Sequence, residues 1–129
     1  MEGQVIIVDT SVLIDFFRKT DKSKSLLISL VREGYSFHIS AITEYEIYSG
    51  ATAMQKEFWQ ELLDKTEVLA FDKQVVQVAI EINGDLKRAR KQIALPDLFI
   101  AATAIRHNLP FATLNRKHFE RIAALNLVG

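Results

Sequence analysis

The stretch Val5-Ile6-Ile7-Val8-Asp9-Thr10-Ser11 decides the predicted fold. Four branched apolar residues in a row are typical of a strand that is buried on both faces, in the middle of a parallel sheet. An acidic residue and two hydroxyl residues follow this strand directly. Because open α/β sheets bind their ligands at the carboxyl ends of their strands, we expect Asp9 to belong to a polar site at that edge of the sheet.

Composition sets limits on the class of protein. The chain has 129 residues, of which 49% are hydrophobic and 25% are charged, and this predicts one globular domain over residues 1–129. Sixteen basic and sixteen acidic residues cancel, so any contact with nucleic acid has to come from a local basic patch. The chain has no cysteine, which excludes disulfides and thiolate sites. Without a signal-peptide pattern or an apolar run of about 20 residues, we expect a cytoplasmic protein with no membrane contact.

Strands and helices alternate along the chain. Further strands are predicted at residues 35–39, 67–71 and 110–114, with an edge strand at 127–128. The predicted helices comprise one capped by Ser11 and others over 20–33, 40–50, 58–63, 72–83, 85–92, 97–107 and 119–125. Asn83-Gly84 predicts a break or kink between two of them. This alternation implies a three-layer α/β/α sandwich around a mostly parallel sheet of four to five strands.

Two further acids, Glu46 and Asp97, are expected at the same edge of the sheet as Asp9, and each of the three also has a purely structural interpretation. Asp9 precedes a helix and suits a cap. Residues 43–46 match the T-x-x-E pattern of a capping box. Asp97 follows Pro96 in a first helical turn, where the helix dipole favours an anion.

Local sequence favours a functional interpretation of the same acids. A helix that begins at Ser40 places Glu46 in its interior, on a face of apolar and small residues. Asp97 opens a strongly apolar helix, so its carboxylate is expected to be partly desolvated, and a buried charge needs a partner. A divalent cation such as Mg²⁺ or Mn²⁺ is a natural partner for carboxylate oxygens.

Four motifs in order carry a family resemblance that spans almost the whole chain. They are Val8-Asp9-Thr10-Ser11, Ser40-Ala41-Ile42-Thr43-Glu44-Tyr45-Glu46-Ile47-Tyr48-Ser49-Gly50, Pro96-Asp97-Leu98-Phe99-Ile100-Ala101-Ala102-Thr103-Ala104 and Ala112-Thr113-Leu114-Asn115-Arg116-Lys117-His118-Phe119. The set resembles a PIN-domain ribonuclease and, more narrowly, the VapC-type toxins of toxin–antitoxin pairs. The resemblance implies a metal-dependent endoribonuclease that uses Mg²⁺ or Mn²⁺ and acts as the toxin of a type II pair.

The resemblance also implies the site residues. Asp9 matches the acid after the family's first strand, Glu46 the acid of its E-[LI]-x-x-G motif and Asp97 the acid of its D-x-x-I-A-A motif. Asn115 falls on the T-x-[DN] position, where many members carry Asp. This neutral residue favours a single metal site, or a second ion held largely by the substrate.

Roles follow from these matches. We expect Asp9 and Asp97 to anchor the cation, and Glu46 to be a third ligand or to orient a metal-bound water. Asn115 and the Thr113 hydroxyl would position water or phosphate. Three hydroxyl residues are expected to support the carboxylates, namely Thr10, Ser11 and Thr113. Ser11 stands where Asn is common in the family.

Basic residues are candidates for contact with RNA. Lys87 and Arg88 belong to a basic run over residues 87–91, and Arg116 and Lys117 follow Asn115 directly. These side chains suit RNA phosphates or an acidic partner, although the run over 87–91 also suits a solvated helix face. The three histidines at positions 38, 107 and 118 are interpreted as structural or surface residues, because the chemistry requires none.

The resemblance further implies two protein partners and leaves three alternatives. The partners are a second copy of the chain, joined through the early helices, and an antitoxin whose tail occupies the acidic groove. One alternative is a housekeeping PIN nuclease that processes RNA, and another is a non-catalytic PIN scaffold. A third is a receiver-like signalling domain, in which Asp72 would be the phosphoacceptor, but Asp9 has no acidic neighbour and no matching late lysine follows.

Overall fold

The computed structural model describes residues 3–129. Strand β1 (Val5–Val8) lies inside a four-stranded sheet of order β3-β2-β1-β4, in which every pair is parallel. The other strands are β2 (Ser36–Ser40), β3 (Glu67–Leu69) and β4 (Phe111–Ala112). The predicted parallel α/β sandwich is confirmed, and the edge strand predicted at 127–128 is a single parallel bridge between Phe111 and Leu127.

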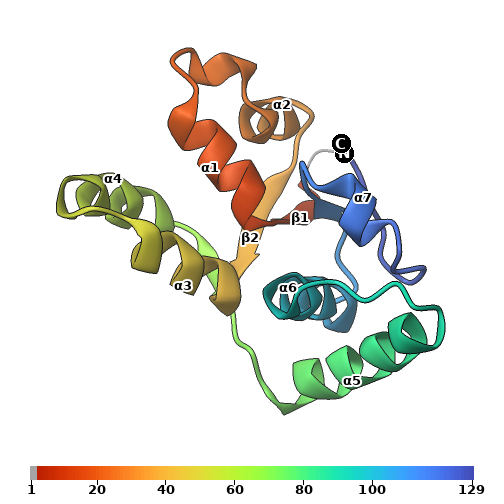
Figure 1. Ribbon diagram of the computed structural model, residues 1–129. Coiled ribbons are helices and arrows are strands. Elements are labelled where there is room, and N and C mark those ends of the chain that lie inside the picture. The colour runs from red at the N-terminus through yellow and green to blue at the C-terminus, as the bar shows by residue number, and fades with distance from the viewer. Residues whose placement is uncertain (1–2) are drawn as a thin grey trace.

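Helices fill both outer layers (Figure 1). They are α1 (Thr10–Arg18), the short 3₁₀ helix η1 (Lys22–Lys24), α2 (Leu26–Arg32), α3 (Ala41–Gly50), α4 (Ala53–Leu63), α5 (Lys73–Arg88), α6 (Leu95–Arg106) and α7 (Arg116–Phe119). Helices α1 to α4 gather on one side of the sheet, and α5 and α6 lie on the other. None of the helices within residues 3–129 is long and apolar enough to cross a membrane.

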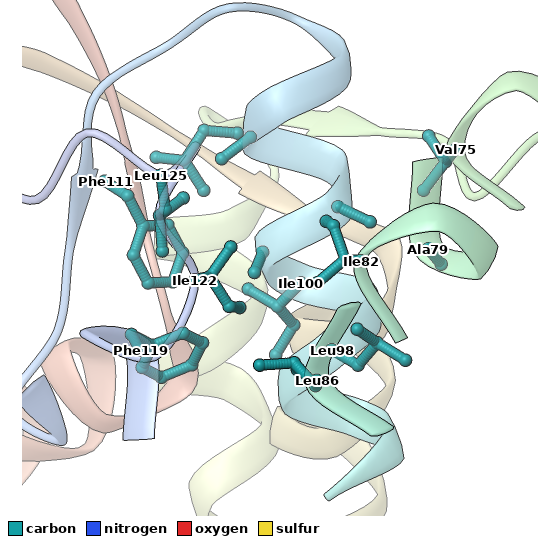
Figure 2. Packing of buried hydrophobic residues seen from close by; sticks show 14 residues of the cluster. Val75, Ala79, Ile82, Leu86, Leu98, Ile100, Phe111, Phe119, Ile122 and Leu125 are labelled. Carbon is teal, nitrogen blue, oxygen red and sulfur yellow. The ribbon is translucent and has the colours of Figure 1, made fainter. Parts of the chain in front are cut away.

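β1 supplies both halves of the core because its side chains alternate between the faces of the sheet. Ile6 and Val8 pack in the cluster formed with α1 to α4, and Ile7 packs in the cluster formed with α5 and α6. All three side chains are fully buried. Figure 2 shows the second cluster, in which Phe111 of β4 and Ile100 of α6 point into the same apolar layer. A continuous apolar run is therefore what this strand requires.

One predicted helix start is wrong, and another is confirmed. Asp9 is the N-cap of α1, since its carboxylate accepts a hydrogen bond from the amide of Val12, and Ser11 lies inside the helix. The helix predicted to begin at Ser40 is confirmed: Ser40 is the N-cap of α3 and accepts a hydrogen bond from the amide of Thr43, so the alternative capping box at residues 43–46 does not form. In each case the residue that ends the preceding strand region already has the extended backbone that a cap requires.

The break predicted at Asn83-Gly84 is also wrong, because α5 continues through both residues to Arg88. Ile82 and Leu86 flank the pair and are 8% and 3% exposed. Burying these two side chains outweighs the roughly 1 kcal/mol by which glycine disfavours a helix. The tertiary contact thus overrides the local propensity.

The last helix, predicted over residues 119–125, in fact forms earlier in the chain. The structure has α7 at Arg116–Phe119, and residues 120–125 form turns. The amide of Ile122 donates to the carbonyl of Phe119, and that of Leu125 donates to the carbonyl of Ile122. These turns repeat every three residues and bury Ile122 and Leu125, so they produce the apolar spacing that was interpreted as a helix.

Candidate active site

The acids Asp9, Glu46 and Asp97 line one cavity of about 650 Å³ at the carboxyl edge of the sheet. Asp9 follows β1, Glu46 lies in α3, which follows β2, and Asp97 lies in the first turn of α6. The rest of the lining comprises Thr10, Ser11, Ile14, Asp15, Arg18, Lys19, Ile100, Leu114 and Asn115. The fold thus brings together three acids that lie far apart in the sequence.

Asp9 is 2% exposed and is held by two hydroxyl groups. Ser11 Oγ donates to its Oδ1 at 2.5 Å, and Thr113 Oγ1 donates to its Oδ2 at 2.6 Å. The amides of Leu114 and Asn115 in turn donate to those two hydroxyl oxygens, at 3.0 and 2.9 Å. Since each hydroxyl oxygen already accepts an amide hydrogen, its own hydrogen is directed at the carboxylate. The arrangement fixes the orientation of Asp9 and joins the start of α1 to the segment after β4.

Glu46 is positioned by the first residue of α1. The Thr10 hydroxyl donates to Glu46 Oε1 at 2.6 Å, and the Thr43 hydroxyl oxygen lies 3.1 Å from that of Thr10. Thr43 is fully buried, which anchors the pair against the sheet. Glu46 is half-buried, so a carboxylate oxygen remains for an occupant of the cavity.

Asp97 lies at the mouth of α6 without capping it. The N-cap residue is Ala94, which offers no side-chain acceptor, so amide groups of the first turn have no side-chain partner there and favour an anion. His118 of α7 contacts the carboxylate, with Nδ1 3.7 Å from Oδ2. Asp97 retains 25% exposure of its side chain, which leaves it accessible from the cavity.

Burial and mutual repulsion disfavour the charged forms of two of these acids. Burial raises the pKa of Asp9 above its ordinary value, as does the nearby charge of Asp97, while the Ser11, Thr113 and Val12 hydrogen bonds oppose this. Burial also raises the pKa of Asp97, Glu46 adds to that effect, and His118 opposes it. The cavity therefore concentrates negative charge that a cation would stabilise.

These shifts predict that the metal-free protein loses stability as the pH rises. Between the ordinary carboxyl pKa of 3.8 and the raised values, the folded protein binds more protons than the unfolded chain. The free energy of unfolding contributed by Asp9 and Asp97 therefore decreases with pH, and the loss is complete above the raised pKa values. Melting temperatures measured from about pH 4 to pH 8 in EDTA, for wild type and for Asp97→Asn, isolate this contribution as a difference.

We expect wild type to fall below Asp97→Asn progressively as the pH increases. Addition of Mg²⁺ or Mn²⁺ at neutral pH should restore the melting temperature of wild type. A difference between the two proteins that stays constant over the whole range would contradict the prediction.

The carboxylate oxygens of the cavity suit a hard divalent cation, but they do not surround such an ion on their own. Within residues 3–129, no group of three or more His, Cys, Asp or Glu side chains is arranged to hold a metal ion on its own. Mg²⁺ commonly binds through one or two carboxylates and keeps several waters. The charge of Asp97 is close enough to raise the pKa of Asp9, which suits ligation of that open kind.

The other predicted site residues divide into two groups. Asn115 lines the acidic cavity and is exposed, and Arg116 and Lys117 line an adjoining cavity that shares Leu114 and Asn115 with it. Lys87 and Arg88 lie at the exposed end of α5 and line neither of these cavities, and Arg88 pairs with Asp85. The structure therefore brings only the pair after Asn115 next to the acids.

Sequence reasoning missed several residues in or beside the cavity, including a further acid, Asp15. Arg18 and Lys19 line it from the end of α1, and His118 contacts Asp97. Arg18 lies seven residues after Ser11, which is the spacing of neighbours on one helix face, so a correct helix start would have indicated it. No spacing signal marks His118, because its contact with Asp97 depends on how α7 packs.

The sequence matches the PIN domain family over residues 6–125. The chain belongs to this family. It is 36% identical to ribonuclease VapC1 of Methanocaldococcus jannaschii over 130 residues, which cover 98% of this chain and 87% of that protein. It is 33% identical to ribonuclease VapC10 of Mycobacterium tuberculosis over 116 residues, which cover 89% of this chain and 86% of that protein.

Solved structures share the fold over nearly the full length. The structure of VapBC2 from Rickettsia felis bound to a DNA fragment from its promoter matches with a TM-score of 0.81 at 23% identity, covering 97% of this chain and 98% of that one. FitAcB from Neisseria gonorrhoeae matches with a TM-score of 0.78 at 26% identity, covering 96% of each chain. The receiver-domain alternative lacks support as well. Its candidate phosphoacceptor, Asp72, is the N-cap of α5 and does not line the acidic cavity.

Proposed function

We propose that this protein is a metal-dependent endoribonuclease and that it acts as the toxin of a type II toxin–antitoxin pair. The observation that carries the proposal is the convergence of Asp9, Glu46 and Asp97 on one cavity in a PIN domain. The names of its relatives support the activity, since ribonucleases VapC1 and VapC10 are similar to this chain over most of its length. We assign the whole of residues 1–129 to this single catalytic domain and the protein to the cytoplasm.

The proposed site residues have separate tasks. Asp9 and Asp97 hold a cation, Mg²⁺ or Mn²⁺, with Glu46 orienting a water molecule beside it. Such a cation supplies charge neutralisation for the phosphodiester and lowers the pKa of a bound water. Asn115 offers a neutral amide to a phosphate oxygen or a water. Thr113 orients Asp9 and opposes the rise of its pKa, because its hydroxyl hydrogen is directed at the carboxylate.

RNA contact is assigned to the basic residues nearest the acids. Arg116 and Lys117 adjoin the acidic cavity through Asn115, so they suit phosphates on one side of the cut. Lys87 and Arg88 lie at the end of α5 and would reach only a longer or folded RNA. Such contacts make binding sensitive to salt, because counterions are released from the phosphates.

Two protein partners complete the proposal. An antitoxin is supported by the structural matches, several of which are toxin–antitoxin complexes, such as the one from Klebsiella pneumoniae with a TM-score of 0.73 at 25% identity. A homodimer through the early helices is supported by exposed apolar side chains on α3 and α4. Tyr45 is 71% exposed and Met54 is 92% exposed, and burying such side chains favours association.

Cleavage of a structured RNA pool by the purified protein tests the activity. We expect cutting with Mg²⁺ and with Mn²⁺ and none in EDTA. The same preparation carrying Asp97→Asn controls for contaminating ribonucleases. Cutting that persists in EDTA, or equally in the variant, would refute the proposed site, and a folded protein that never cuts would favour the scaffold alternative.

A growth assay separates a toxin from a housekeeping nuclease. Expression of a toxin arrests growth, and co-expression of the small protein encoded beside it restores growth. A housekeeping enzyme would cut RNA in vitro and leave growth unchanged.

A further inference from the structure

The hydroxyl of Thr43 belongs to a chain of side-chain contacts that ends on Glu46. Thr43 lies in the first turn of α3 and is 0% exposed, as is Ser40 at the end of β2. The Thr43 hydroxyl oxygen lies 3.1 Å from that of Thr10 and 3.4 Å from that of Ser40. Thr10 in turn donates to Glu46 Oε1 at 2.6 Å. The chain therefore crosses from α3 to α1 and returns to α3, and these two helices follow the neighbouring strands β2 and β1 (Figure 1).

The direction of each hydrogen bond in this chain follows from the number of hydrogens available. A hydroxyl group has one hydrogen to donate and can accept two. The hydrogen of Thr10 is committed to Glu46, because a hydroxyl–carboxylate contact of 2.6 Å is of the stronger, charge-assisted kind. Since Thr10 has no second hydrogen, its 3.1 Å contact with Thr43 is a bond in which Thr43 donates and Thr10 accepts. Ser40 accepts from the amide of Thr43 and can direct its own hydrogen at the Thr43 oxygen, over the longer distance of 3.4 Å.

Thr10 depends on a neighbouring side chain in a way that the hydroxyl groups supporting Asp9 do not. Ser11 and Thr113 each accept a backbone amide hydrogen, which fixes the direction of their own hydrogens. Among residues 3–129, no amide donates to the Thr10 oxygen, and the Thr43 hydroxyl is its one donor. Donation to Thr10 also polarises its O–H group and strengthens its bond to the carboxylate. Without Thr43, the Thr10 hydroxyl would be free to turn away from Glu46.

Neither the helix cap nor the packing of α3 requires the Thr43 hydroxyl. Ser40 caps α3 through the backbone amide of Thr43, which almost any residue would supply. The buried volume would be filled equally well by valine, and a buried hydroxyl group is unfavourable unless it is hydrogen-bonded. What the hydroxyl alone supplies is the hydrogen that Thr10 accepts.

We propose that Thr43 is a positioning residue of the active site. Through Thr10 it fixes Glu46 Oε1, which leaves Glu46 Oε2 to hold the water beside the cation. Thr43 is fully buried and does not line the acidic cavity, so it touches neither the cation nor the RNA. The inference rests on the proposed ribonuclease function, which assigns that water to Glu46.

Kinetics of RNA cleavage in Mg²⁺ separate the hydroxyl of Thr43 from its packing. Thr43→Val keeps the volume and removes the hydroxyl, whereas Thr43→Ser keeps the hydroxyl and removes a methyl group. We expect Thr43→Val to lower kcat by about 10–100-fold and to leave KM for RNA unchanged, because only the placement of Glu46 is altered. Thr43→Ser should restore most of kcat.

Two further variants complete the kinetic test. Thr103→Val makes the same change at another fully buried threonine, whose hydroxyl donates to the carbonyl of Phe99 and which lies outside the acidic cavity, and it should leave kcat unchanged. Thr10→Val removes the link between Thr43 and Glu46 and should lower kcat as Thr43→Val does. Because Thr43 acts through Thr10, combining Thr10→Val with Thr43→Val should lower kcat no further than Thr10→Val alone.

Crystal structures of the metal-free variants give a readout that does not depend on cleavage. We expect the 2.6 Å contact between Thr10 Oγ1 and Glu46 Oε1 to be retained in Thr43→Ser and lost in Thr43→Val. Melting temperatures establish beforehand that each variant is folded. If Thr43→Val does not fold, Thr43→Ala takes its place in the comparison with Thr43→Ser, because it too lacks the hydroxyl.

Three results would overturn the positioning role. They are a wild-type kcat in Thr43→Val, an equal loss of kcat in Thr43→Val and Thr43→Ser, and an unchanged contact between Thr10 and Glu46 in the Thr43→Val crystal. Any of them, obtained while wild type shows metal-dependent cleavage, refutes the role of Thr43 alone. Loss of the contact in Thr43→Val, in a protein whose wild type never cuts RNA, would support the positioning of Glu46 by Thr43 and refute the proposed ribonuclease function.

Discussion

Asp97→Asn is expected to lower the rate of RNA cleavage by at least about a hundredfold while leaving the fold intact. Changes to groups that only support metal ligands typically lower affinity or activity by about 10–100-fold, so loss of a ligand should exceed that. The fold should tolerate the change because Asp97 does not cap α6 and, within residues 3–129, its side chain pairs only with the exposed His118. Removing a carboxylate whose pKa is raised by burial and by Glu46 should even stabilise the metal-free protein at neutral pH.

Initial rates at saturating Mg²⁺, together with melting temperatures in EDTA, measure both parts of this prediction. Asp85→Asn is the matched control, because Asp85 is an exposed acid of a helix with a basic partner and lies outside the acidic cavity. We expect Asp85→Asn to cut as wild type does. Equal cleavage rates in the Asp97→Asn and Asp85→Asn proteins would exclude Asp97 from the active site.

Phe111→Ala is expected to lower the free energy of unfolding by about 3–5 kcal/mol. Phe111 is fully buried in β4 and packs against Phe119 with ring centroids 4.8 Å apart, as Figure 2 shows within the surrounding apolar layer. A loss of this size is a large part of the roughly 5–15 kcal/mol that stabilises an ordinary domain. Because Thr113 follows β4 by one residue, the same change should also disturb the support of Asp9.

Urea denaturation followed by circular dichroism measures the loss of stability. Ile80→Ala provides the control, since Ile80 is 66% exposed on α5 and surface substitutions usually change stability by less than about 0.5 kcal/mol. A loss below about 1 kcal/mol for Phe111→Ala would show that β4 is not part of the cooperative core.

The central strand of the fold was predictable because the sequence of β1 reflects the burial of both its faces. A strand that packs on helices from both sides needs apolar residues at consecutive positions, and residues 5–8 have them. The straight path of α5 through Asn83 and Gly84 was not predictable from local propensity. It depends on Ile82 and Leu86 packing in the core cluster that α5 shares with α6, which no local window contains.

The carboxylate site was predictable only in part. Local patterns placed Asp9 at the end of a strand and left its cap interpretation open, and the structure shows that it does cap α1 while also facing the cavity. The resemblance pointed to Thr113, because the family pattern carries a hydroxyl there. Arg18 and His118 were not predicted. The position of Arg18 at the cavity depends on which face of α1 it occupies, and the contact of His118 with Asp97 depends on how the short helix α7 packs.

The hydrogen bond from Thr113 to Asp9 joins residues that are 104 positions apart. During translation Asp9 leaves the ribosome long before β4 has been made, and its carboxylate lacks both the Thr113 hydroxyl and the fourth strand of the sheet until then. A nascent chain, or one terminated before β4, carries all three acids without an assembled site. The acidic site is therefore assembled only when synthesis of the chain is nearly finished.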